Sequence, residues 1–252
     1  MAGTDVMVGM LGKHPPKIDV RTLRMARYMN TTELPPAPPS LDLTTKVKEF
    51  PMYDNDKIGD CTCAAAGHMI EIWTSQTAHP DMPTDQEILA AFDKVKIEGP
   101  DGEEGANELD VLNYWQSTGI AGDTLAAFGA LTRTDHTLMQ QAVNLFAGSY
   151  IGLSLPISAQ HQDVWDFNGS YSGDNKPGSW GGHAVNVSGY DAETVSFVTW
   201  GMVKKMTWRF WDAYCDEAYA LLSMGWFDGS TKAPNGLDID ALRKDLQVAT
   251  GG

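Results

Sequence analysis

Two short segments carry side chains that could act as a nucleophile and as its base. Residues 53–69 read YDNDKIGDCTCAAAGHM and place Cys61 and Cys63 where a loop turns into a helix of small residues. The unpaired N–H groups and the positive dipole end of a helix N-terminus favour thiolate over thiol there. Residues 179–190 read SWGGHAVNVSGY, with His183 opening a predicted buried strand. A cysteine and a histidine far apart in sequence can meet in space, so they form a candidate pair for nucleophilic catalysis.

The composition is that of an acidic globular protein. The chain has 252 residues, 42% of them hydrophobic, which is enough for one sizeable domain or two lobes around a cleft. With 18 Lys and Arg against 33 Asp and Glu, the formal net charge is −15. Such a charge repels nucleic acid and anionic membrane surfaces, so we expect neither a nucleic-acid nor a membrane partner.

The three cysteines do not form a disulfide framework. Cys61 and Cys63 are only two positions apart, and Cys215 is the third, so a reducing compartment is the default and Cys63 and Cys215 are interpreted as structural. The N-terminus lacks the pattern of a signal peptide, and no apolar run approaches the ~20 residues of a membrane span. We therefore expect a cytoplasmic protein, or one carried in a particle assembled in the cytoplasm.

The two ends of the chain differ in composition from its middle. Residues 1–40 contain a basic patch, KIDVRTLRMAR, followed by LPPAPPSLDL, whose prolines favour extended backbone. This pattern predicts an extended, Pro-rich arm lying across the domain, with a helical propeptide as the competing interpretation. Residues 229–252 are predicted to be a C-terminal tail.

The first half of the chain predicts helices. Residues 61–76 have good helix formers, and their small side chains allow close approach of other backbone, so this helix is predicted to be central and buried. Residues 84–97 begin with a Thr-x-x-Glu capping box. Residues 107–117 and 135–147 predict two further helices.

The second half predicts strands. Residues 150–155, 183–190 and 194–200 are apolar and rich in β-branched types, with turn residues between them. Residues 205–223 combine an aromatic, helix-like part with a closing strand. Helices followed by a mainly antiparallel sheet indicate an α+β fold.

The order of these segments resembles the papain-like cysteine peptidases, most closely their bacterial and phage-type members. A Pro-rich stretch ending in Leu-Asp-Leu precedes Tyr-Asp-x-x-x-x-Gly-x-Cys-Thr, which aligns Cys61 with the family's nucleophile, and GGHAVNVSGY aligns His183 with its base. The two residues are 122 positions apart (183 minus 61), a little below the ~130–150 typical of papain. The resemblance covers about residues 34–223.

The resemblance implies a single two-lobed domain over residues 41–228. Its helical lobe would span about 41–148, with the central helix at Cys61, and its antiparallel β lobe would span about 149–228 and carry His183. A cleft between the lobes would hold the substrate.

Two supporting positions depart from the family pattern. Asn55 stands where the family has its oxyanion-hole Gln; it is one methylene shorter but still an amide donor. Val198 stands at the family's orienting Asn and cannot accept an imidazole N–H, which leaves Thr199 or Asn186 as substitutes. Asp60, beside the cysteine, opposes thiolate formation.

These features support two hypotheses of different classes. The first is a cysteine peptidase or amidase-type acyl hydrolase that uses Cys61 and His183, with Asn55 as the oxyanion donor and a peptide or amide as substrate. The second is a catalytically inactive papain-like domain that serves as a structural or binding component of a protein assembly such as a virion, with the N-terminal arm making the contact.

No cofactor is implied by the pattern. His68 is interpreted as a core residue, and His161 and Asp163 lack the spacing of metal ligands, so no metal is expected.

Overall fold

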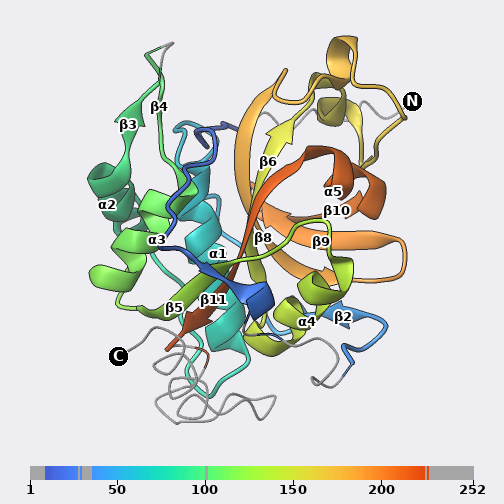
Figure 1. The fold of residues 1–252 in the computed structure, drawn as a ribbon. Coiled ribbons are helices and arrows are strands. Elements are labelled where there is room, and N and C mark those ends of the chain that lie inside the picture. Colours follow the sequence, from blue (N-terminus) through green and yellow to red (C-terminus); the bar gives the residue numbers. More distant parts are fainter. Residues whose placement is uncertain (1–8, 28, 30–35, 100–101, 225, 227–252) are drawn as a thin grey trace.

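The computed structural model describes residues 9–27, 29, 36–99, 102–224 and 226. Three helices and a short hairpin lie on one side of the molecule, and a large sheet with two helices lies on the other (Figure 1). The first group comprises α1 (Cys61–Ser75), α2 (Asp85–Val95), the hairpin of β3 (Ile97–Glu98) and β4 (Glu104–Gly105), and α3 (Glu108–Ser117).

The sheet is mainly antiparallel. Its strands follow the order β1 (Leu23–Arg24), β5 (Leu125–Ala130), β11 (Cys215–Ser223), β6 (Ser149–Leu155), β8 (Gly181–Tyr190), β9 (Thr194–Thr199), β10 (Met202–Thr207) and β7 (Val164–Trp165), with β2 (Leu41–Asp42) paired to β8. The pairs β1–β5 and β10–β7 are parallel. The remaining elements are α4 (His136–Phe146), α5 (Trp208–Tyr214) and the 3-10 turns η1 (Met25–Arg27), η2 (Ile157–His161) and η3 (Gly173–Asn175). The predicted α+β class is confirmed.

Helix α1 is the buried centre of the molecule, as its small residues predicted. Every residue from Cys61 to Thr74 is buried. Gly67 lets Tyr53 and Ile88 approach, because a Cβ there would lie 2.7 Å from the Tyr53 ring and 2.9 Å from Cδ1 of Ile88. The small residues thus bring neighbouring elements within contact distance of the helix that begins with the candidate nucleophile.

Replacing Gly67 by alanine is therefore expected to destabilise the fold. Helix propensity alone would favour alanine by ~1 kcal/mol, but overpacking of a core typically costs ~1–3 kcal/mol. We expect a net loss in the free energy of unfolding, measured by urea denaturation. Ala90→Gly, at an exposed position of α2, is the control and should lose ~1 kcal/mol from propensity alone. A gain of stability in Gly67→Ala would show that the close approach is not tight.

The other predicted helices and strands are found with small shifts at their ends. The Thr84 side chain accepts from the backbone of Glu87, and the Glu87 carboxylate accepts from the backbone of Thr84, so the predicted capping box is present. Strand β5 was not predicted because LAAFGA has weak strand propensity. It forms nevertheless because β11 and β1 pair with its two edges.

The N-terminal segment, residues 9–16, runs between the helical side and the sheet (Figure 1). On the helical side, Met10 N–H donates to Asn55 O at 2.7 Å and His14 N–H donates to Ala106 O at 3.0 Å. On the sheet side, Lys13 N–H donates to Gly182 O at 3.1 Å. The segment therefore bridges the two sides of the molecule.

Parts of the predicted arm and tail lie outside the described residues, namely 1–8, 28 and 30–35 of the arm and all of 229–252. The described part of the arm also contains β1 and η1, and Lys17 pairs with Asp110 at 2.6 Å. Across the described residues, no helix combines the length and apolar character of a membrane span. The cytoplasmic or particle-borne location stays a prediction.

Candidate active site

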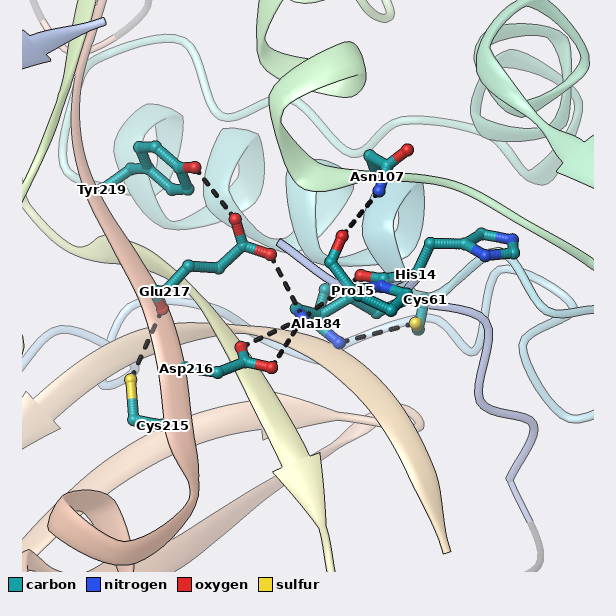
Figure 2. Close-up of polar contacts among 10 residues, drawn as sticks. His14, Pro15, Cys61, Asn107, Ala184, Cys215, Asp216, Glu217 and Tyr219 are labelled. Carbon is teal, nitrogen blue, oxygen red and sulfur yellow. Dashed lines mark hydrogen bonds and ion pairs between the residues drawn. The ribbon is translucent and has the colours of Figure 1, made fainter. Parts of the chain in front are cut away.

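Cys61 is the first residue of α1 and lies against the start of β8. Its Sγ accepts a hydrogen bond from the backbone N–H of Ala184 at 3.5 Å (Figure 2). Ala184 directly follows His183, so the cysteine segment lies beside the histidine segment, and the catalytic roles of Cys61 and His183 stay predictions. Cys61 is only 1% exposed.

His183 is held from two sides. Its Nε2 and the hydroxyl of Thr199 are hydrogen-bonded at 2.6 Å, and the Trp200 ring stacks on the imidazole with 4.7 Å between centroids. Its Nδ1 has no hydrogen-bond partner among the described residues. Thr199 and Trp200 stand at the end of β9 and just beyond it, beside β8, so the antiparallel pairing of these strands positions both groups.

Of the two substitutes considered for the orienting Asn, Thr199 is the one that is hydrogen-bonded to His183. Asn186 pairs with Val198 across the β8–β9 ladder, and both residues are buried. Neither polar atom of the Asn186 side chain has a hydrogen-bond partner within the described part of the chain, so it does not contact the imidazole. The hydroxyl therefore provides the polar partner that Val198 cannot.

Asn55, the predicted oxyanion donor, is buried in the loop before α1. Its Nδ2 donates to the carbonyl of Ile58 at 3.0 Å, and its own carbonyl accepts from Met10. The amide is thus engaged within the loop in this state. Its role as a donor to a reacting carbonyl stays a prediction.

The electrostatics of the site contradict the expected thiolate. Burial raises the pKa of Cys61 to about 12, with Asp60 adding to the effect, and burial likewise raises the pKa of Cys63. Burial lowers the pKa of His183 to about 3, and the positive charge of Lys13 contributes. The expectation that the helix N-terminus favours thiolate at Cys61 or Cys63 is wrong for this state, because desolvation outweighs the helix dipole. Both thiol and imidazole are neutral here.

The charge of Asp60 is also reduced by its surroundings. Burial raises its pKa to about 7, against an ordinary value near 3.8. Its predicted opposition to a neighbouring thiolate is confirmed in direction and is weaker where the carboxyl is protonated.

The remaining histidines and acids named from the sequence make no hydrogen bond to Cys61 or His183 within the described part of the chain. His68 is buried, with Nε2 2.8 Å from the Pro51 carbonyl, and packs against the Phe50 and Tyr53 rings, as expected of a core residue. His161 and Asp163 are exposed. Among the described residues, no group of three or more His, Cys, Asp or Glu side chains is arranged to hold a metal.

Sequence reasoning missed the residues of the N-terminal segment that cover the site. Gly12 passes so close to the loop before α1 that a Cβ would lie 1.8 Å from the Gly59 carbonyl oxygen. Lys13 is buried beside Gly182, the residue before His183. The pair Gly12-Lys13 carries no sequence signal for these contacts, because every partner is distant along the chain.

The arrangement defines a class of fold. The chain has the papain-like cysteine protease fold. The evidence comes from solved structures, since no family model and no curated protein matches the sequence.

Three similar structures illustrate the match. Xylellain, a cysteine protease from Xylella fastidiosa, superposes with a TM-score of 0.63 at 14% identity, covering 85% of this chain and 96% of that one. Digestive procathepsin L 3 of Tenebrio molitor larval midgut gives 0.58 at 15% identity, covering 86% and 76%. The proform of the ragweed pollen allergen Amb a 11, a cysteine protease, gives 0.57 at 11% identity, covering 80% and 70%. At these identities the likeness establishes the fold alone.

Proposed function

We propose that this protein is a cysteine peptidase or amidase-type acyl hydrolase whose cleft is closed by its own N-terminal segment. The observation that carries the proposal is the placement of His183, which is bonded to Thr199, stacked under Trp200 and adjacent to the Ala184 N–H that contacts Cys61. A buried histidine that served packing alone would not need all three contacts beside a helix-opening cysteine.

The chemistry follows from these groups. With Nε2–H donating to Thr199, Nδ1 of His183, which has no partner in the closed state, would take the Cys61 proton once the two side chains come into contact, and the thiolate would attack the substrate carbonyl. The imidazolium then gives that proton to the leaving amine as the C–N bond breaks. Water, deprotonated by the same imidazole, attacks the acyl-enzyme, and the proton returns to the departing Cys61 sulfur. Asn55 would stabilise the oxyanion once its amide turns from the Ile58 carbonyl.

Closure of the cleft explains the neutral pair. Residues 9–16 lie against Gly59 and Gly182, beside the buried Cys61 and His183, and the Lys13 charge further disfavours an imidazolium. Two of the similar structures are described as a proform and a procathepsin. By analogy, we take the N-terminal segment to hold the enzyme latent until it moves or is cut.

The proposal is tested by replacing Thr199 in a variant whose N-terminal segment has been displaced. Gly12→Val should displace the segment, because a side chain at Gly12 collides with the Gly59 carbonyl. In that background we expect hydrolysis of peptide-amide substrates. Thr199→Val should then lower kcat/KM by ~10- to 100-fold, since a general base contributes ~10²–10⁴ and this change removes only its orientation. Thr199→Ser is the matched control and should retain most activity, with an unchanged pH profile. Equal rates for the Val and Ser variants would contradict the orienting role.

A second candidate function is a catalytically inactive papain-like domain within a protein assembly. The observations that favour it are the burial of all three cysteines and the engagement of the Asn55 amide within its own loop. Absence of hydrolysis in every displaced variant, together with self-association or partner binding that depends on the N-terminal arm, would support this alternative.

A further inference from the structure

The structure contains a buried carboxylate pocket that the candidate chemistry does not use. It is formed by Glu108, the first residue of α3, and by Asp216 and Glu217 of β11, and it encloses the side chain of Lys13. Figure 2 shows Asp216, Glu217 and Tyr219. The Lys13 ammonium lies 3.0 Å from Asp216 and 3.1 Å from Glu217. The Tyr219 hydroxyl donates to the other oxygen of Glu217 at 2.9 Å, which fixes that carboxylate.

The pocket has more acidic groups than its occupant can pair. Three carboxyl groups face one ammonium, and Glu108 is 0% exposed, with neither of its oxygens hydrogen-bonded within the described part of the chain. Burial and the nearby Glu217 raise the pKa of Glu108, while Glu108, Asp216 and Glu217 together raise the pKa of Lys13. Because buried carboxylates are costly without a cation, the pocket is selective for a positive charge.

The walls fit a long aliphatic stem that ends in a cation. On β6, Gly152 forms the wall along the Lys13 stem, since a Cβ there would lie 2.0 Å from Cε of Lys13 and 2.8 Å from Oδ1 of Asp216. Asp216 is 26% exposed and, with Glu217 and Tyr219, also lines an adjoining cavity of about 310 Å³. The charged end of the pocket therefore has room for a head group larger than an ammonium.

The pocket opens next to the candidate nucleophile. The backbone N–H of Lys13 donates to the carbonyl of Gly182, two residues before the Ala184 N–H that contacts Cys61. Lys13 also pairs with Ala106 in a short bridge, with Ala106 N–H donating to the Gly12 carbonyl at 2.8 Å. Any chain that places a side chain in this pocket is thus held by backbone hydrogen bonds beside Cys61.

We propose that the pocket of Glu108, Asp216 and Glu217 is a specificity site that binds a lysine or arginine side chain of the substrate, in the place that Lys13 occupies in the closed state. The part that concerns substrates rests on the proposed function; the binding of an alkyl cation by the pocket does not. The basic side chain would fix the register in which the substrate backbone lies against Cys61.

The pocket is tested first without any catalytic assay. In the full chain with Lys13→Gly, n-butylammonium matches the deleted side chain, and 1-butanol is its neutral counterpart. We expect butylammonium to raise the thermal unfolding midpoint of this variant by at least ~2 °C, and 1-butanol to raise it by none, since only a ligand that binds the folded state stabilises it. Lys17→Gly, which empties an exposed ion pair instead, is the matched control and should not respond. Equal responses to amine and alcohol would overturn the proposal.

Two further variants guard against a Lys13→Gly chain that does not fold. Lys13→Arg should keep a midpoint near that of the unchanged protein, whereas Lys13→Met, of similar length but uncharged, should lower it. A methionine variant as stable as the arginine variant would show that the pocket does not require a cation, and would also overturn the proposal.

The substrate experiment uses the Gly12→Val protein and a set of peptides that differ at one position, which is lysine, arginine, methionine or leucine. We expect kcat/KM to be at least ~10-fold higher for lysine and arginine, and Glu217→Gln to remove that preference, because a hydrogen-bonded charge in a buried site discriminates strongly. Cleavage of the methionine peptide as fast as the lysine peptide would overturn the specificity site. Cleavage of none would overturn the proposed function instead, and the amine experiment would still decide whether the pocket binds cations.

Discussion

Replacing Gly12 by valine is expected to raise the rate at which iodoacetamide alkylates Cys61 by ~10²–10³-fold at pH 8. Burial raises the pKa of the thiol to about 12 in the closed state, so almost none of it is ionised at that pH. Uncovering the thiol moves its pKa toward the ordinary ~8.5, where about a quarter is ionised. Mass spectrometry of the three cysteine peptides over time gives the rate for each.

A substitution elsewhere in the N-terminal arm is the control for Gly12→Val. Ile18→Ala alters an exposed side chain further along the N-terminal arm and should leave all three rates unchanged. Lys13→Ala, which removes the buried anchor, should raise the Cys61 rate as well. Equal acceleration of Cys61, Cys63 and Cys215 in Gly12→Val would indicate general unfolding, and an unchanged Cys61 rate would show that the segment does not protect the thiol.

The second large effect is the loss of hydrolysis when either member of the candidate pair is removed. In the Gly12→Val background, Cys61→Ala and His183→Ala are each expected to lower kcat by at least ~10³-fold, as removal of a nucleophile or its base does in other hydrolases that act by acyl transfer. The effect of the double variant should be close to that of either single one, because the two residues act as a unit.

Cys63→Ala is the matched control for Cys61→Ala. Cys63 is two residues further along α1 and fully buried, and it should affect stability more than rate. Retained hydrolysis in Cys61→Ala would remove this cysteine from the mechanism, whereas loss of hydrolysis in Cys63→Ala at unchanged stability would exchange their roles.

Much of the fold could be predicted because its signals are local. The small residues after Cys61 indicated a buried helix, and the Thr84 and Glu87 capping box located the start of the next one. The positions of the candidate pair were visible in the same way, since Cys61 opens its helix and His183 lies in an apolar strand, while their catalytic roles stay predictions. Thr199 was one of two orienting candidates, and it is the one whose hydroxyl is hydrogen-bonded to His183.

The electrostatic state of the site could not be predicted, because it depends on contacts between distant parts of the chain. Lys13 pairs with Asp216, 203 positions away, and no local pattern around Lys13 indicates a buried cation. The helix N-terminus at Cys61 was visible in the sequence, but the segment that covers Cys61 was not, so the expected thiolate was wrong. Burial thus governs the ionisation of the candidate pair, and residues 9–16 contact the segments of both residues.

The pairing of β1 with β5 has a consequence for how the closed state could open. Leu23 and Arg24 are fixed to the edge of the sheet, only a few residues after the segment proposed to close the cleft. If residues 9–16 leave while this pairing holds, they stay tethered close to the cleft, at an effective concentration in the millimolar range. A separate peptide of the same sequence would need comparable concentrations to compete. Opening without a cut would therefore be reversible within one molecule, whereas a cut between the segment and β1 would make it permanent.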